Sequence, residues 1–185
     1  IMSVGDDKTV RLWCIGKRFE SYKNAINVNF ACFSPDGLNL MVVQDKSAQI
    51  WDLTGEKIAV FKGHTQTINT ARFSPDGKFV ATASSDGTTH IYSREGKLLK
   101  VLDQHSATVN DAVFSPDGKK LITVSNDSTI IIYDLLTNKY IKSYEHNGCV
   151  TSVAFSPSGE TFVTGGTDKK VVLHSLDGNV VRTFA

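Results

Sequence analysis

Histidine, serine and aspartate residues occur in this chain in a combination that could support nucleophilic catalysis. His64, Ser84 and Asp86 are the residue types of a hydrolytic triad, in which serine attacks, histidine takes its proton and a carboxylate orients the histidine. The same set recurs one repeat later as His105, Ser125 and Asp127. An active site needs such a set only once, and the Gly-x-Ser-x-Gly turn of many hydrolases is absent from the sequence. The repetition favours a structural role, and we expect no enzyme activity.

The five histidines could also suggest a metal site. His64, His105 and His146 are spaced by 41 residues, so each lies in a different repeat. Neighbouring sheets pack ~10 Å apart, whereas zinc lies ~2 Å from its ligands, so these equivalent histidines cannot share an ion. His90 has no cysteine or carboxylate at ligand spacing, and Gly165-Gly166 is not followed by the Lys-Ser/Thr of a phosphate loop. We therefore predict neither a metal nor a cofactor.

The elements that position these residues repeat with a period of 40 or 41. The turn Phe-Ser-Pro-Asp-Gly begins at Phe33, Phe73 and Phe114, and a variant with Ser158 in place of the aspartate begins at Phe155. A second series pairs an aspartate with an aromatic residue or histidine six residues later. Its members are Asp7 and Trp13, Asp45 and Trp51, Asp86 and Tyr92, Asp127 and Tyr133, and Asp168 and His174. Several series with one period indicate a repeat protein.

Within one period the pattern predicts four β-strands and no helix. Residues 67–73, 78–84, 88–92 and 97–102 alternate or are rich in β-branched residues, and turn residues separate them. Ser74-Pro75-Asp76-Gly77 suits a type I turn, and Asp86-Gly87 suits a hairpin that needs positive φ angles. A single four-stranded antiparallel sheet cannot bury both faces alone. Radial stacking of such sheets into a β-propeller solves this problem, with an open β-solenoid as the alternative.

At these residues the sequence resembles the WD-repeat β-propeller family. Gly63-His64, Asp86 and Trp51-Asp52 correspond to the Gly-His pair, the turn aspartate and the closing Trp-Asp of its repeats. The resemblance implies structural tetrads that link an aromatic residue, a strand hydroxyl, a histidine and the turn aspartate. Two repeats carry such sets, His64–Ser84–Asp86–Tyr92 and His105–Ser125–Asp127–Tyr133.

Other repeats depart from this pattern. One keeps His146 and Asp168 but has Gly166 and His174 at the remaining positions, and an earlier one keeps Asp45 and Trp51 but has Asn24 and Val43. The first segment keeps only Asp7 and Trp13. We therefore expect packing to contribute more than the polar network to the stability of these sheets.

The period also predicts the organisation of the chain. It divides into a partial repeat at 1–21, repeats at 22–62, 63–103, 104–144 and 145–178, and the start of another at 179–185. About four and a half repeats are fewer than the seven of a common propeller, so we expect an incomplete arc, with a four-bladed ring as the alternative.

Composition and charge narrow the class of partner. Hydrophobic residues make up 41% and charged residues 21%, and 20 Lys+Arg against 19 Asp+Glu give a net charge of +1. This balance offers no general attraction to nucleic acid or membrane. Three cysteines, none in a Cys-x-x-Cys pair, indicate reduced thiols, and we expect a cytoplasmic protein.

The resemblance implies a scaffold that binds proteins or peptides as a subunit of a large complex. Loops carry function on such folds, and the positions that precede the turn aspartate or the first strand form a candidate partner-binding face. They are Asp6, Gln44, Ser85, Asn126, Thr167, Asn27, Thr67, Thr108 and Cys149. The phrases from His105 to Asn110 and from Ser125 to Thr129 are similar to centriolar and basal-body WD-repeat proteins, which implies a ciliary or cytoskeletal role. A subunit that recognises modified tails for a modifying enzyme is a further alternative.

Overall fold

The computed structural model describes the backbone of residues 2–5, 9–14, 17–22, 28–143 and 146–184, and the side chains of 28–141 and 146–184. The described residues form nineteen β-strands in five antiparallel sheets, here called blades 1 to 5. Blade 1 has three strands, β1 (Met2–Gly5), β2 (Thr9–Cys14) and β3 (Lys17–Tyr22). No helix in the described part of the chain has the length and apolar character to span a membrane.

The other blades have four strands each, in sequence order from the inner to the outer edge. Blade 2 contains β4 (Val28–Phe33), β5 (Asn39–Gln44), β6 (Ser47–Asp52) and β7 (Lys57–Phe61). Blade 3 contains β8 (Ile68–Phe73), β9 (Phe79–Ser84), β10 (Thr89–Ser93) and β11 (Leu98–Leu102). Blade 4 contains β12 (Val109–Phe114), β13 (Lys120–Ser125), β14 (Ile130–Asp134) and β15 (Tyr140–Ser143). Blade 5 contains β16 (Val150–Phe155), β17 (Thr161–Gly166), β18 (Val171–Ser175) and β19 (Val180–Phe184).

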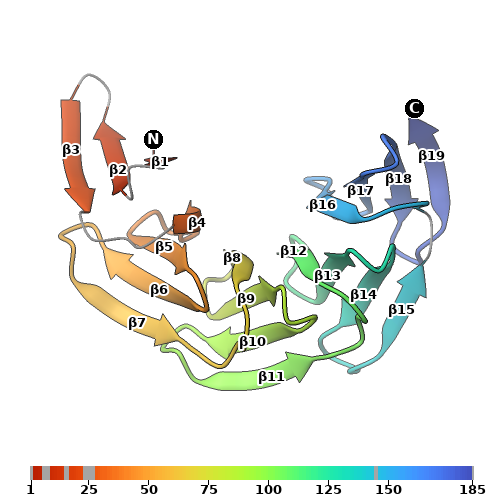
Figure 1. Cartoon of the computed structure of the whole chain (residues 1–185), viewed down its shortest axis with the longest axis horizontal. Helices are drawn as coiled ribbons and strands as arrows, with labels where there is room; N and C mark the ends of the chain where they lie inside the picture. Colours follow the sequence, from red (N-terminus) through yellow and green to blue (C-terminus); the bar gives the residue numbers. More distant parts are fainter. Residues whose placement is uncertain (1, 6–8, 15–16, 23–27, 144–145, 185) are drawn as a thin grey trace.

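The blades stand side by side in an open arc (Figure 1). The inner strands β4, β8, β12 and β16 lie on the concave side and contact one another in turn, and β7, β11, β15 and β19 lie on the convex side. This arrangement confirms the predicted all-β architecture of four-stranded blades. The five blades do not close into a ring, because blade 1 and blade 5 stand at opposite ends of the arc.

The repeat boundaries need one adjustment at the end of the chain. Residues 179–185 were expected to start a further repeat, but β19 pairs with β18 along its length. The strand Val180–Phe184 is therefore the outer strand of blade 5, whose first strand begins at Val150. The strands predicted in blade 3 agree with the structure to within one residue at each end.

The hydrophobic core lies between the blades. Each of three clusters joins side chains of two adjacent sheets, as Ile50 and Phe61 of blade 2 do with Ile68 and Tyr92 of blade 3. The second strands of blades 2 to 4 are buried on both faces, which explains why β9 and β13 are rich in Val, Ala, Ile and Thr with no polar alternation. In blade 5, which lies at the end of the arc, β17 is buried on one face only. Stacking of the sheets therefore supplies the burial that one sheet lacks.

The repeated Phe-Ser-Pro-Asp-Gly turns have the predicted geometry. The Gly77 N–H donates to the Ser74 carbonyl at 2.9 Å, and Gly77 has a φ of +70° that few residues other than glycine adopt. The Ser74 hydroxyl donates to Asp76 at 2.6 Å, and the Phe79 N–H donates back to the Ser74 hydroxyl at 3.0 Å. The serine of the turn thus fixes both the turn and the first residue of the second strand.

Neighbouring turns of this type also touch one another. A Cβ built on Gly77 would lie 3.9 Å from Pro35, one on Gly118 would lie 3.8 Å from Pro75, and one on Gly159 would lie 3.3 Å from Pro116. The proline of one blade therefore packs beside the glycine of the next.

The hairpins at the other end of the blades differ from the expectation in one respect. Positive φ was expected at both Asp86 and Gly87, but only Gly87, with a φ of +84°, has it. Ser128 and Lys169 hold the same place in blades 4 and 5 with φ of +68° and +65°.

Candidate functional site

A buried histidine network lies at the hairpin end of blade 3. The Nδ1 of His64 donates to the Asp86 carboxylate at 2.9 Å, and its Nε2 lies 2.7 Å from the Thr82 hydroxyl. Because Nδ1 carries the proton, Nε2 accepts from the hydroxyl. Burial lowers the pKa of His64, which keeps the ring neutral although Asp86 acts against this shift.

The Asp86 carboxylate organises the loop around this histidine. It accepts hydrogen bonds from the Thr88 hydroxyl at 2.6 Å and from the Thr65 N–H at 2.9 Å. Burial acts to raise the pKa of Asp86, but the bonds from Thr88, Thr65 and His64 outweigh it and lower that pKa. One carboxylate thus joins the turn to the loop that enters blade 3.

The strand hydroxyl of the network is not the one that the sequence suggested. Ser84 was assigned this role, yet its hydroxyl donates to the Thr67 carbonyl at 2.9 Å and accepts from the Asp86 N–H at 3.2 Å. Thr82, two residues earlier on the same face of β9, contacts the histidine instead. Ser84 therefore stabilises the hairpin turn.

Blade 4 repeats both the network and the correction. His105 Nδ1 lies 3.1 Å from Asp127, and its Nε2 lies 2.8 Å from Thr123. Ser125 was expected to hold the hydroxyl role, but its hydroxyl donates to the Ala107 carbonyl at 3.2 Å. Burial acts to raise the pKa of Asp127, but bonds from Thr129, Ser106 and the nearby His105 lower it to about 2.

Blade 5 contains a four-membered polar chain that the sequence did not suggest. His146 Nδ1 donates to Asp168 at 2.9 Å, and its Nε2 accepts from Thr164 at 2.9 Å. The Thr164 hydroxyl then lies 2.8 Å from Nε2 of His174, which must be the donor because the hydroxyl proton is already used. His174 therefore acts as an N–H donor at the position that carries Trp51 in blade 2.

Gly166 was expected to leave this repeat without a complete tetrad, but the chain of hydrogen bonds runs through Thr164 and does not need a side chain at position 166. A Cβ on Gly166 would lie only 2.6 Å from His146 Nδ1 and 2.9 Å from Asp168. The histidine and the carboxylate occupy the space that a side chain would need.

The aromatic positions of blades 2 to 4 have several environments. Tyr92 is buried and its hydroxyl donates to the Lys62 carbonyl at 3.0 Å, while Tyr133 is buried between blades 3 and 4. Trp51 is half-buried, with the Lys57 ammonium 4.8 Å from its ring centre. Among the described residues, no histidine is hydrogen-bonded to Asp45. Its carboxylate accepts a hydrogen bond from the Thr67 hydroxyl at 3.4 Å. Asp6, Asp7 and Asn27, like the side chain of Trp13, lie outside the described residues.

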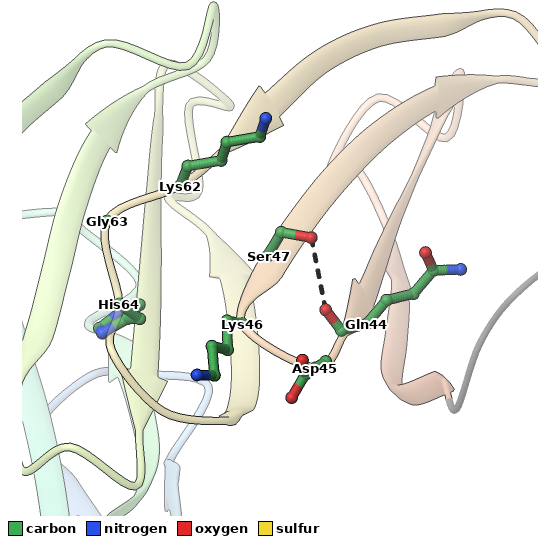
Figure 2. A pocket seen from close by; sticks show the side chains of 7 residues that line it. All are labelled: Gln44, Asp45, Lys46, Ser47, Lys62, Gly63 and His64. Carbon is green, nitrogen blue, oxygen red and sulfur yellow. Dashed lines mark hydrogen bonds between the residues drawn. The ribbon is translucent and has the colours of Figure 1, made fainter.

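The structure brings the candidate partner-binding residues of blades 3 to 5 together in pairs. Ser85 donates its N–H to the Thr67 carbonyl at 2.8 Å, and Asn126 and Thr167 do the same to Thr108 and Cys149 at 2.9 Å. The three pairs recur at the same end of three successive blades. Gln44 lies at the end of β5 and borders a pocket between blades 2 and 3 that is lined by residues 44–47 and 62–64 (Figure 2).

Sequence reasoning missed a series of asparagines that joins the inner strands. The side-chain amides of Asn29, Asn69 and Asn110 each donate to a carbonyl of the next blade, at 3.1, 2.8 and 2.7 Å. Their spacing of 40 and 41 residues repeats the period, so the signal was present. Asn110 also donates to the side chain of Asn126 at 2.7 Å, and Ser85 donates to Asn69 at 3.3 Å. Ser85 and Asn126 of the candidate face are therefore hydrogen-bonded to the asparagines that join neighbouring blades.

Two further interactions between or within blades carried no periodic signal. Arg72 of blade 3 donates through two nitrogens to the buried carboxylate of Asp111 in blade 4, both at 3.2 Å, and lies over the Phe30 ring of blade 2. His90 packs inside blade 3, where its buried ring stacks on His64 with 3.7 Å between the centroids.

The geometry of the histidine networks favours a structural role for these histidines over a catalytic one. Both ring nitrogens of each period histidine are bonded within its own blade, so none is available as a general base for a serine. Within the described ranges, no group of three or more His, Cys, Asp or Glu residues is arranged to hold a metal ion.

Comparison with known families agrees with the arrangement of the blades. The family described as "WD domain, G-beta repeat" matches residues 16–52, 55–93, 96–134 and 138–175, which is most of the chain. This chain belongs to the WD40-repeat family. Each matched WD40 segment starts near the outer strand of one blade and ends with the third strand of the next, so the sequence repeat is offset from the structural blade.

Several known proteins are similar to this chain over part of its length. Protein HIR1 of Candida albicans is 38% identical over 88 residues, which cover 46% of this chain and 10% of that protein. The target of rapamycin complex subunit wat1 of Schizosaccharomyces pombe is 31% identical over 97 residues (49% and 31%). Eukaryotic translation initiation factor 3 subunit I of Caenorhabditis elegans is 33% identical over 109 residues (49% and 33%). The matched region therefore spans a third or less of each of these relatives.

Proposed function

We propose that this WD40 chain is a non-catalytic protein-interaction scaffold that acts within a multiprotein assembly. The observation that carries the proposal is the set of three residue pairs, Thr67 with Ser85, Thr108 with Asn126, and Cys149 with Thr167. They recur at one end of three successive blades and present uncharged polar groups of different size. Such a surface suits recognition of a protein or peptide through shape and hydrogen bonds.

The framework beneath this surface supports the same role. The histidine networks and the asparagine series hold each turn to its own blade and each blade to the next, so the surface is pre-organised and binding costs little ordering entropy. Two relatives are described as subunits of larger assemblies, a target of rapamycin complex and a translation initiation factor, which is consistent with membership of a complex.

The test is co-purification followed by mass spectrometry from cells that express the tagged chain. A variant with Ser85→Arg, Asn126→Arg and Thr108→Arg should lose the partners that the parent captures reproducibly. The matched control carries Lys78→Glu and Lys119→Glu, which lie beside the turns at the opposite end of the same blades. This control should keep those partners.

Capture that survives the triple substitution would move the binding surface elsewhere. The identities of the partners would also decide location: centriolar or axonemal proteins would support a ciliary role, and other cytoplasmic proteins a different assembly.

A further inference from the structure

The loop that enters blade 5 contains Asn147-Gly148, the one Asn-Gly pair in the sequence. Asn147 is exposed and Gly148 is half-buried. An asparagine that precedes glycine can cyclise, because no Cβ on the next residue hinders attack of its backbone nitrogen on the side-chain carbonyl carbon. Whether a folded chain permits this reaction depends on whether hydrogen bonds restrain the two groups.

Neither reacting group is restrained in this loop. Within the part of the chain that the structure describes, the Gly148 N–H and the side-chain amide of Asn147 make no hydrogen bond. The backbone N–H of Asn147 does have a partner, since it donates to the Asp168 carboxylate at 3.2 Å. The loop is therefore anchored at Asn147, while the nucleophilic nitrogen and the side chain that it would attack are unbonded.

Five Asp-Gly pairs elsewhere in the chain have the opposite arrangement. In each of them the glycine N–H donates to the carbonyl of a serine three residues earlier, at 2.8 to 3.3 Å or less. The aspartate side chain of each pair also accepts a hydrogen bond from a neighbouring hydroxyl. These pairs are Asp36-Gly37, Asp76-Gly77, Asp86-Gly87, Asp117-Gly118 and Asp177-Gly178.

The carboxylates of these pairs are also poor sites for ring closure, because a carboxyl group must be protonated before a nitrogen can displace its oxygen. The serine hydroxyl of the turn, followed by a backbone N–H, lowers the pKa of the carboxyl group in four of the five pairs. These four are Asp36, Asp76, Asp117 and Asp177. Asn147-Gly148 is thus the pair in which both the chemistry and the hydrogen bonding permit cyclisation.

Packing explains why glycine occupies position 148. A Cβ there would lie 2.6 Å from the Thr167 hydroxyl, so a larger residue would displace the hairpin of blade 5. The corresponding pairs are Thr65-Gln66 in blade 3 and Ser106-Ala107 in blade 4. Threonine and serine have no side-chain carbonyl, so neither pair can cyclise in this way.

We propose that Asn147 is a site of spontaneous deamidation through a succinimide formed with Gly148. The Gly148 nitrogen, after loss of its proton, attacks Cγ of Asn147 and forms a new C–N bond. The bond from Cγ to the side-chain nitrogen breaks, and this nitrogen leaves as ammonia with the proton. Water then adds to one of the two ring carbonyls, a ring C–N bond breaks, and the Gly148 nitrogen regains a proton. The product is aspartate or isoaspartate, and no oxidant or reductant takes part.

The reaction changes the loop in two ways. Either product places a new carboxylate beside Asp168, which accepts the hydrogen bond from the N–H of residue 147. Isoaspartate also routes the main chain through the former side chain and so lengthens the loop. The longer loop strains the bond to Asp168 and the 2.9 Å bond from the Thr167 N–H to the Cys149 carbonyl. The reaction requires only this loop and water, so the proposal is independent of the scaffold function.

The test is mass spectrometry of tryptic peptides after incubation of the folded chain in ¹⁸O-labelled water at neutral pH. Trypsin cleaves after Lys142 and Lys169, and the peptide 143–169 contains Asn147 as its one asparagine and no glutamine. This peptide should exchange NH for ¹⁸O at a rate within about tenfold of that of a synthetic peptide of the same sequence, because an unbonded loop gives little protection. The rate should rise with pH. Peptides that contain Asn110 or Asn126 should stay unlabelled.

Matched variants separate the chemistry from its consequence. Asn147→Ser introduces the residue type of blade 4, keeps the backbone bond to Asp168 and should abolish labelling of the peptide 143–169. Asn147→Asp adds the charge without lengthening the main chain. The deamidated fraction of the parent, isolated by ion exchange, should have a lower urea midpoint than Asn147→Asp, and Asn147→Asp a lower one than Asn147→Ser.

Two results would overturn the proposed site. The first is a peptide 143–169 that stays unlabelled in the folded chain while the synthetic peptide reacts, which would show that the loop protects Asn147. The second is equal labelling of the peptides that contain Asn110 or Asn126, which would place the reaction in unfolded molecules. A deamidated fraction with the urea midpoint of Asn147→Ser would overturn the predicted strain in the loop. Partner capture that depends on Ser85 and Asn126 tests the scaffold function separately.

Discussion

Replacing Thr164 with valine should destabilise the chain more than the same change at Thr123. Valine keeps the shape of threonine but removes the hydroxyl. In blade 5 that hydroxyl lies 2.9 Å from His146 Nε2 and 2.8 Å from His174 Nε2, and both rings are buried. In blade 4 the Thr123 hydroxyl contacts one histidine nitrogen, that of His105, at 2.8 Å.

The expected size follows from the number of buried groups left without a partner. Each such group costs about 1–3 kcal/mol, so Thr164→Val should lower the free energy of unfolding by about 2–6 kcal/mol and Thr123→Val by about 1–3 kcal/mol. A chain of this size loses about 2–4 °C of melting temperature per kcal/mol, so the Thr164→Val loss corresponds to a melting temperature lower by about 4–24 °C.

The assay is urea unfolding followed by circular dichroism, with Thr151→Val as the control. Thr151 is exposed, and its hydroxyl donates to the Gly165 carbonyl of its own blade at 3.0 Å, so its replacement should change stability by about 0.5 kcal/mol or less. A Thr164→Val variant as stable as this control would refute the polar chain. Equal losses for Thr164→Val and Thr123→Val would refute the shared hydroxyl.

Two further predictions concern pH and the contacts between blades. Burial, and then the proximity of His146, lowers the pKa of His174 from 6.5 to about 4, so its contribution to stability should be complete above pH 6.5 and decline as the pH falls towards 4. His174→Phe should make urea unfolding less dependent on pH in this range, and an unchanged dependence would contradict the assignment. Asn110→Ala removes the 2.7 Å bond to Val150 and should cost about 1 kcal/mol. Amide hydrogen exchange in β16 should become faster in that variant, and unchanged rates would show that packing alone joins blades 4 and 5.

The strands and turns were predictable because they depend on local geometry. Proline presets its own φ, glycine tolerates a positive one, and the pair recurs in three successive turns and in the variant turn at Pro157-Ser158-Gly159. The intervals between such turns leave room only for short strands, so the predicted limits in blade 3 are correct to within one residue.

The hydroxyl partner of each histidine was not predictable, for a physical reason. Thr82 and Ser84 are two residues apart on one strand, so their side chains point to the same face of the sheet and the period of two cannot separate them. The depth at which the His64 loop crosses that face decides which hydroxyl it meets. The same ambiguity applies to blade 5. Gly166, at the position of Ser84, suggested an incomplete tetrad, but Thr164, at the position of Thr82, contacts the histidine.

The pocket between blades 2 and 3 lies between these two cases. Phe33 and Asp45 are 12 residues apart, whereas the matching residues of the next three repeats are 13 apart, so the sequence recorded that the hairpin between β5 and β6 is shorter than that between β9 and β10. Whether the shorter hairpin leaves a pocket depends on the loop at 62–64, which lines the space and does not fill it. Only the packing of two blades could reveal that.

The sequence by itself determined the repeat, the all-β fold and the order of strands, because turn chemistry and the burial pattern act over a few neighbouring residues. Tertiary structure decided which polar groups meet across loops and blades, among them Thr82 with His64, Arg72 with Asp111, and Asn110 with Val150. Those contacts depend on the height and rotation of one sheet against another. Residues two apart on a strand lie ~7 Å apart on the same face, so the height of the facing loop or sheet selects one partner over its neighbour.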